Sequence, residues 1–227
     1  VLFRSQNLRA TVLAFNAFAL TGERKYKDWV LEYTDAWVDR ARANGGIMPS
    51  NIGLDGKIGS AAGGKWYGGV YGWGFTVRGP QTGAMADRTR TESGWAGLRS
   101  AFYLTANEKY LDCWRTQLDT INAQRRMKNG KYEYPRMFGD NGWYGWTSQP
   151  YDYNALEMYL LSMREDDAKR AGGEPWLDFL AGNNSDYPEK ALRGSLEYIR
   201  KRVAGMRADE TTPDTRLADD PMEFNPA

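Results

Sequence analysis

The segment AFALTGERKYKD at residues 17–28 returns as AFYLTANEKYLD at residues 101–112, and this repeat decides the fold. The two copies lie 84 residues apart, and Asp35 and Asp119 keep the same offset. Around each copy, apolar residues recur every three or four positions on both sides of a short polar break. This spacing predicts two amphipathic helices joined by a turn in each copy.

The repeat predicts antiparallel helix pairs near residues 6–43 and 91–127, and a looser third pair near 151–204. One pair cannot bury its apolar face alone, so neighbouring pairs are expected to stack into a ring or a solenoid. We therefore predict an all-α chain with an α/α toroid of the six- or seven-hairpin type, of which about three hairpins lie here. Residues 1–227 are interpreted as one incomplete toroid domain, a fragment of a longer protein, with an extended tail over residues 206–227.

Composition restricts the function classes. A formal charge of +1 gives no electrostatic reason to expect nucleic acid or an anionic membrane as a partner. Without histidine, these residues hold no Ser-His-Asp triad, no Cys-His dyad and no histidine-containing metal site. The single cysteine, Cys113, cannot form an internal disulfide. No carboxylate cluster has the spacing of metal ligands, so we expect no metal or other cofactor.

Two long connections, residues 44–83 and 129–151, are rich in aromatic residues, and the first is rich in glycine. Aromatic rings offer a flat apolar face and, in Trp and Tyr, a polar group, which together suit sugars. The alternative is that the rings pack against one another at the mouth of the toroid. Because both connections adjoin equivalent helix ends, we expect the segments 65–75 and 132–146 to meet on one face.

Charged side chains flank the aromatic runs. Arginine binds a carboxylate through a two-pronged pair of hydrogen bonds, so basic residues beside aromatic platforms indicate an anionic sugar. Each arginine alone can equally be part of an ordinary surface ion pair. The predicted substrate-binding residues are Asn51, Lys65, Trp66, Tyr67, Tyr71, Trp73, Arg88, Asp140 and Trp143.

Four features together resemble bacterial α/α-toroid polysaccharide lyases: the helix-pair repeat, PSNIGLDG at 49–56, KWYGGVYGWGF at 65–75 and YPRMFGDNGWY at 134–144. The similarity covers most of residues 6–227 and is closest to lyases that act on alginate or glucuronan. It implies β-elimination at a uronic acid, an acidic polysaccharide or oligosaccharide as partner, and a periplasmic or secreted location. Such lyases often pair a tyrosine with a histidine, and this chain has none.

The resemblance implies a cation that neutralises the sugar carboxylate and a residue that transfers protons. Arg136 is predicted as the neutralising group, because a guanidinium is always charged and matches a carboxylate in shape. Tyr144 is predicted as acid, base or both, and a nearby cation would have to favour its phenolate for work as a base. The alternative for Tyr144 is a stacking wall. Tyr67 and Tyr71 are reserve candidates, and Asp87 is a further candidate for proton transfer.

Two other functions stay open. A glycoside hydrolase of the same architecture would use two carboxylates about 5–10 Å apart. The loop carboxylates available for such a pair are Asp55, Asp87, Glu133 and Asp140. A carbohydrate-binding module without catalysis would keep the aromatic platforms and lack a working base.

Overall fold

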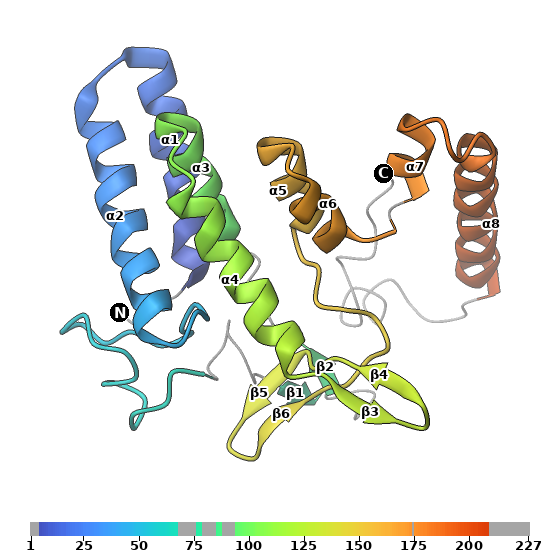
Figure 1. Ribbon diagram of the computed structural model, residues 1–227, viewed down its shortest axis with the longest axis horizontal. Coiled ribbons are helices and arrows are strands. Elements are labelled where there is room, and N and C mark those ends of the chain that lie inside the picture. Colours follow the sequence, from blue (N-terminus) through green and yellow to red (C-terminus); the bar gives the residue numbers. More distant parts are fainter. Residues whose placement is uncertain (1–4, 68–75, 79–84, 88–93, 174, 209–227) are drawn as a thin grey trace. The chain divides into compact units, whose positions relative to one another are not determined.

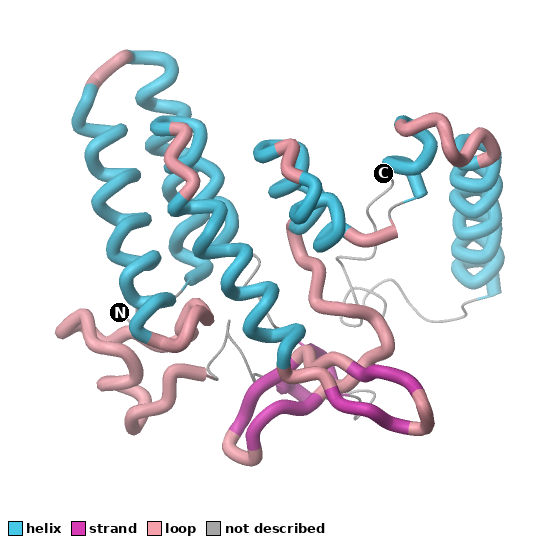
Figure 2. Tube along the Cα trace, viewed as in Figure 1, coloured by secondary structure: helices cyan, strands magenta, loops and turns pink. Residues whose placement is uncertain are grey.

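The computed structural model describes residues 5–67, 76–78, 85–87, 94–173 and 175–208 of the chain. This described part is mainly helical, with three short antiparallel strand pairs (Figure 2). It divides into two compact units: described residues up to Ala171 belong to the first unit, and those from Gly172 onward belong to the second. The prediction of a mainly helical chain is confirmed, and closure into a toroid stays a prediction.

The first unit contains two helical hairpins that follow the sequence repeat (Figure 1). Helices α1, α2 and α3 pack against one another, and α4 contacts α2 and α3. The predicted pairs near 6–43 and 91–127 are therefore confirmed. The elements are, in chain order, the 3-10 helix η1 (Ser5–Arg9), α1 (Ala10–Thr21), α2 (Arg24–Ala43), α3 (Trp95–Thr105) and α4 (Lys109–Ala123).

Both hairpins turn in the same way. A threonine ends the first helix, and its hydroxyl donates to the carbonyl oxygen four residues earlier while accepting the N–H two residues later. Thr21 and Thr105 make these bonds at the same distances, 2.7 and 3.2 Å. The next residue, Gly22 or Ala106, is left-handed, with φ of 70° or 52°. The sequence repeat is therefore also a structural repeat, and it includes the turn between the helices.

A third, shorter hairpin follows within the first unit, formed by α5 (Ala155–Ser162) and α6 (Glu165–Ala171). It shares part of this turn, because the Ser162 hydroxyl accepts the N–H two residues later at 3.2 Å and Met163 has φ of 53°, although the hydroxyl donates to Asp167 rather than to the carbonyl four residues earlier. The prediction of one pair spanning 151–204 is wrong in extent. Gly172-Gly173, both with positive φ, end the pair, since such a backbone cannot continue a helix.

The core of the first unit lies between the hairpins, and the predicted apolar spacing supplies it. Along α2 and α4 the buried side chains recur every three or four residues, so one stripe of each helix faces inward. Each fully buried large apolar side chain contributes about 1.5–3 kcal/mol. The largest fully buried residues on the hairpins and η1 are Leu8, Trp37, Leu98, Tyr110, Leu111, Trp114, Leu118 and Ile121.

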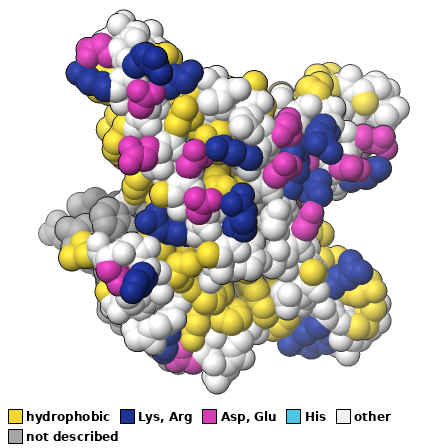
Figure 3. Space-filling model, turned by 60° about the vertical axis from the view of Figure 1, so that its left-hand side comes forward, with side chains coloured by type: hydrophobic (Ala, Val, Ile, Leu, Met, Phe, Trp, Pro, Cys, Tyr) yellow, Lys and Arg dark blue, Asp and Glu magenta, His cyan; other side chains and the backbone are white. Residues whose placement is uncertain are grey.

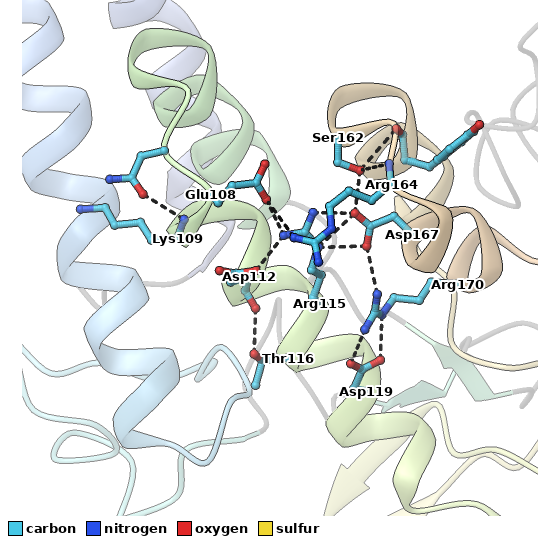
Figure 4. A network of polar contacts seen from close by, with 12 residues as sticks. Glu108, Lys109, Asp112, Arg115, Thr116, Asp119, Ser162, Arg164, Asp167 and Arg170 are labelled. Carbon is cyan, nitrogen blue, oxygen red and sulfur yellow. Dashed lines mark hydrogen bonds and ion pairs between the residues drawn. The ribbon is translucent and has the colours of Figure 1, made fainter.

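A buried ion pair connects the third hairpin to the second (Figure 4). The Nε and Nη2 of Arg115 on α4 donate to the carboxylate of Asp167 on α6 at 2.6–3.0 Å. The exposed fractions of these side chains are only 8% and 0%. The Ser162 hydroxyl also donates to Asp167 at 2.6 Å, and Arg170 binds Asp119 at 2.8 Å. The turn of the third hairpin is therefore tied to α4.

Short strands lie in and beside the connections that the sequence pattern predicts as loops. All three pairs are antiparallel and belong to the first unit. They are β1 (Thr76–Arg78) with β2 (Met85–Asp87), β3 (Arg126–Lys128) with β4 (Lys131–Glu133), and β5 (Met137–Gly139) with β6 (Gly142–Tyr144).

The second unit contains α7 (Pro175–Leu180) and α8 (Tyr187–Ala208) in its described part. The predicted start of an extended tail at residue 206 is wrong, because α8 continues to Ala208. Its apolar spacing explains this, since Met206 lies three residues beyond Val203. Residues 209–227 lie outside the described residues.

Acidic and basic side chains intermingle on the face shown in Figure 3. Apolar side chains gather in the lower part of that view. Among the described helices, none combines the length and apolar character needed to cross a membrane.

Candidate functional site

The loop that follows α2 is folded by its own backbone. Gly59 has φ of 72°, and a side chain there would collide with the backbone of Gly64, since a Cβ would lie only 2.6 Å away. Asn51 is 4% exposed, and its Nδ2 donates to the carbonyl oxygens of Lys65 and Tyr67 at 3.3 and 2.6 Å. The structure thus places Asn51 beneath the 65–67 segment as its support, and contact of Asn51 with a ligand stays a prediction.

The hairpin of β5 and β6 brings the second aromatic segment to this loop. Phe138 and Trp143 are paired across the strands, so both side chains lie on one face of the hairpin. Their rings are 4.9 Å apart at 76°. On the same side, the Trp66 ring stacks on Phe138 at 4.9 Å and 29°, and the Tyr67 ring meets it edge-on at 5.0 Å. We call these four residues the aromatic patch.

The patch confirms that residues 65–67 of the first aromatic segment meet the second segment. Residues 68–75 of the first segment lie outside the described residues. Phe138, at its centre, was not among the predicted binding residues. The signal for it was its place opposite Trp143 across a short turn. The predicted residues Tyr71, Trp73 and Arg88 lie outside the described residues.

A polar cluster borders the patch. Asp140, in the β5–β6 turn, accepts from Lys65 Nζ at 2.7 and 2.8 Å and from the Tyr67 hydroxyl at 2.8 Å. The hydrogen bond from Lys65, followed by that from Tyr67, lowers the pKa of Asp140. The hydrogen bond to Asp140 in turn raises the pKa of Tyr67. Near neutral pH the cluster therefore holds an ionised carboxylate, an ammonium and a neutral phenol.

Tyr144 lies on the other face of the same hairpin. It is paired with Met137, and neighbouring residues of a strand point to opposite faces, so Tyr144 is turned away from Phe138 and Trp143. Its ring leans over Gly139, where a Cβ would lie 3.2 Å from Tyr144 Cε1. The hairpin thus separates Tyr144 from the patch, and its role in catalysis stays a prediction.

Arg136 precedes β5 and is engaged with the chain after β6. Its Nη2 donates to the carbonyl oxygens of Gln149 and Pro150 at 2.9 and 2.8 Å, and its guanidinium lies 5.6 Å from the centre of the Tyr151 ring. Its Nη1 is buried and makes no hydrogen bond to the described residues. The contacts of Arg136 therefore hold the segment 149–151, and its role as the neutralising group stays a prediction.

Asp55 and Glu133, two of the described loop carboxylates, are bound by side chains that lie close to them in the sequence. Asp55 accepts from the Ser60 hydroxyl at 2.6 Å, which is the main reason that its pKa is lowered. Glu133 pairs with Arg126 at 2.8 Å and with Lys128 at 3.7 Å. The side chain of Asp87 lies outside the described residues. Of the described side chains, no group of three or more His, Cys, Asp or Glu could hold a metal ion.

A comparison with known protein families places the chain in one of them. A family model described as a domain of unknown function, DUF8034, matches residues 4–137 and 162–227, which is most of the chain. The chain belongs to this family. No curated protein matches the chain, and no solved structure does. The DUF8034 match includes the loop from α2 to Tyr67, whereas the β5–β6 turn and β6 lie between its two matched ranges. The aromatic patch is therefore built from both matched and unmatched residues.

Proposed function

We propose that the aromatic patch binds an acidic polysaccharide and that the protein cleaves a uronic-acid-containing chain, of the alginate or glucuronan type, by β-elimination. The observation that carries the proposal is the juxtaposition of Trp66, Phe138 and Trp143 with the Lys65–Asp140–Tyr67 cluster. Aromatic faces suit the apolar C–H faces of sugars, and an ammonium at their edge suits a uronate carboxylate.

In β-elimination a base removes the C5 proton, and the electrons of that bond form the C4–C5 double bond. The C4–O bond breaks, and an acid protonates the departing oxygen. Tyr67 is the candidate for the acid, because a phenol is protonated at neutral pH, and the hydrogen bond to Asp140 raises its pKa further. The same shift makes Tyr67 unsuited as the base. Tyr144 remains the candidate for the base, and Lys65 joins Arg136 as a candidate to neutralise the carboxylate.

The proposal extends to the fold. Three hairpins have similar turns, and Asp35 and Asp119, 84 residues apart, each bind a basic residue of the next hairpin. These features support a series of stacked hairpins, of which an α/α toroid is the closed form. In such a series the connections after each hairpin reach the same rim, where a long polysaccharide could lie across them.

The hydrolase alternative has less support among the described residues. A hydrolase needs one carboxylic acid with a raised pKa as proton donor. The pKa values of Asp55 and Asp140 are both lowered, and Glu133 is paired with two cations. A binding function without catalysis is the stronger rival, because Tyr67 is not suited to act as a base.

The test uses the complete protein with alginate and with glucuronan. Unsaturated product, followed by its ultraviolet absorbance, is expected for the lyase, and reducing ends without that absorbance would indicate a hydrolase. Binding by calorimetry without any product would leave only the binding function. Failure of both polyuronates to bind would overturn the proposal.

Substitutions separate binding from catalysis. Trp66→Ala should weaken binding about tenfold, by loss of a stacking surface, while Trp146→Ala in the same region should not. Tyr67→Phe keeps the ring and removes the proton, so turnover should fall about 10²–10⁴-fold with little change in binding. Tyr132→Phe on β4 is its matched control. Arg136→Ala and Tyr144→Phe should also reduce the rate of elimination strongly. If the rate of the Tyr144→Phe enzyme stays within about twofold of the parent, Tyr144 only stacks against the substrate.

A further inference from the structure

An aromatic groove lies on the outer face of α2. It has a volume of about 350 Å³ and is lined by Trp29, Glu32, Tyr33 and Ala36, with Leu54 from the following loop. The rings of Trp29 and Tyr33 are stacked, 5.2 Å apart at 9°. Trp29 is 42% exposed and Leu54 is 74% exposed, so this apolar surface is open to solvent.

Because of the sequence repeat, α4 has a face equivalent to this one, and the two faces can be compared. Four of the α2 residues that line the groove correspond, 84 residues later, to four residues of α4, and the loop after the first hairpin covers part of that face of α4, leaving Thr116 exposed. Gln117 is 1% exposed, and its Oε1 accepts the N–H of Met48 at 2.9 Å. A Cβ on Gly46 would lie 2.6 Å from Cγ2 of Thr116, so the two segments are in close contact. The corresponding α4 residues are Cys113, Thr116, Gln117 and Thr120.

The same correspondence holds for the charged residues at the boundary where one hairpin packs against the next, which we call a seam. Asp35 of the first hairpin pairs with Lys109 at the start of α4 at 2.8 Å, and Tyr110 beside it is 1% exposed. The matching residues at the start of α2 are Lys25 and Tyr26. Lys25 pairs with Glu23 of its own turn, and both of these side chains are at least half exposed.

We propose that the outer face of α2 is the docking surface for a further helical hairpin of this repeat, supplied by the same polypeptide. The hairpin would cover Trp29 and Tyr33 and place a carboxylate at Lys25 and Tyr26. The sequence repeat already places one hairpin against the next along this chain, so a further repeat unit of the same polypeptide fits this face. A second copy is less suited, because its seam acids, Asp35 and Asp119, are already paired. This inference is independent of the enzymatic activity.

Cysteine accessibility in the complete protein tests the proposal. Trp29→Cys and Glu32→Cys place a thiol on the groove, and Tyr103→Cys on α3, at a position 54% exposed, is the control. Cys113 gives a low background, because burial raises the pKa of its thiol to about 12. The groove thiols should react with a maleimide roughly tenfold more slowly than the control, at low and high protein concentration alike. Glu32→Cys, on a solvent-facing polar position, serves if the loss of Trp29 disturbs folding.

Three results would overturn the proposal. Groove thiols that react as fast as the control at every concentration would show an uncovered face. Protection that appears only at high concentration would assign the face to a second copy. Protection that appears only with added oligouronate would make the groove a carbohydrate site.

Discussion

Removal of the buried charge at Asp167 should destabilise the protein more than any other single exchange of a carboxylate on its described helices. Asp167→Asn keeps the size of the side chain and removes the negative charge that faces Arg115. The guanidinium would stay buried, at 8% exposure. Glu108 and Asp112 would still bind its Nη1 at 2.6 and 2.7 Å, but both are half exposed.

The expected loss follows from this geometry. Breaking a buried ion pair by removing one partner costs about 3–5 kcal/mol. The two remaining carboxylates place Asp167→Asn near the lower end, about 3 kcal/mol. Asp119→Asn is the matched control, because its pair with Arg170 has exposed fractions of 56% and 26% and should contribute no more than about 1 kcal/mol.

Urea unfolding, followed by tryptophan fluorescence, measures both variants against the parent at equal m-value. The double variant Arg115→Met/Asp167→Leu should recover stability relative to Asp167→Asn, because it leaves no unpaired buried charge. If Asp167→Asn and Asp119→Asn lose equal free energy of unfolding, the buried pair is not what joins the third hairpin to α4.

The pair also predicts a pH dependence. Burial by itself would raise the pKa of Asp167, but the hydrogen bonds from Arg115 and Ser162 outweigh burial and lower it. The stabilisation is therefore complete above the unfolded-state pKa of about 3.9 and is lost as the pH falls through the folded-state value. The parent should lose its advantage over Asp167→Asn only below about pH 4.

Two further predictions concern single positions. Ala106→Gly should raise the free energy of unfolding by about 0.5–1 kcal/mol, because Ala106 has φ of 52° where the equivalent turn has Gly22. Thermal unfolding would show this as a higher Tm. An unchanged Tm would mean that the turn is not strained. Asp140→Asn should lower the pKa of Tyr67, because it removes the negative charge that opposes the phenolate, and an ultraviolet titration compared with Tyr67→Phe would detect it; an unchanged titration would show that the Tyr67–Asp140 bond does not persist in solution.

The sequence predicted the helical hairpins well because their information is local and repeated. Apolar spacing, a Thr at the helix end and a left-handed residue after it recur in both copies. The third hairpin was harder, because Ser162 and Met163 replace Thr and Gly and the helices are shorter. Its end at Ala171 was nevertheless marked by Gly172-Gly173, which the apolar pattern alone did not register.

The strand pairs were missed although their turns carry a signal. Asn129 and Gly130 have φ of 51° and 74°, the paired positive values of a two-residue hairpin turn, and Asn-Gly is the most frequent sequence there. The strands on either side have only three residues each, too short for an alternating pattern to stand out. The dipeptide, rather than the flanking residues, was the informative feature.

The site shows where spacing in the sequence ceases to predict proximity. Lys65, Asp140 and Tyr67 were predicted as binding residues, and the structure brings them into one cluster. Tyr144, only one residue from Trp143, lies on the other face of the hairpin, because the side of a strand residue depends on pairing register. In a loop, neighbouring residues can be expected on the same side, whereas neighbouring residues of a strand point to opposite faces.

The patch follows from the order of the hairpins. Each hairpin reverses the chain, so α2 and α4, the second helices of successive hairpins, end on the same side, and their loops leave side by side (Figure 1). The two loops then stabilise each other: Lys65 is held by Asp140, and Trp66 stacks on Phe138. A ligand bound across the patch would therefore contact the segments that follow two successive hairpins, and its binding energy would add to the contact between these segments.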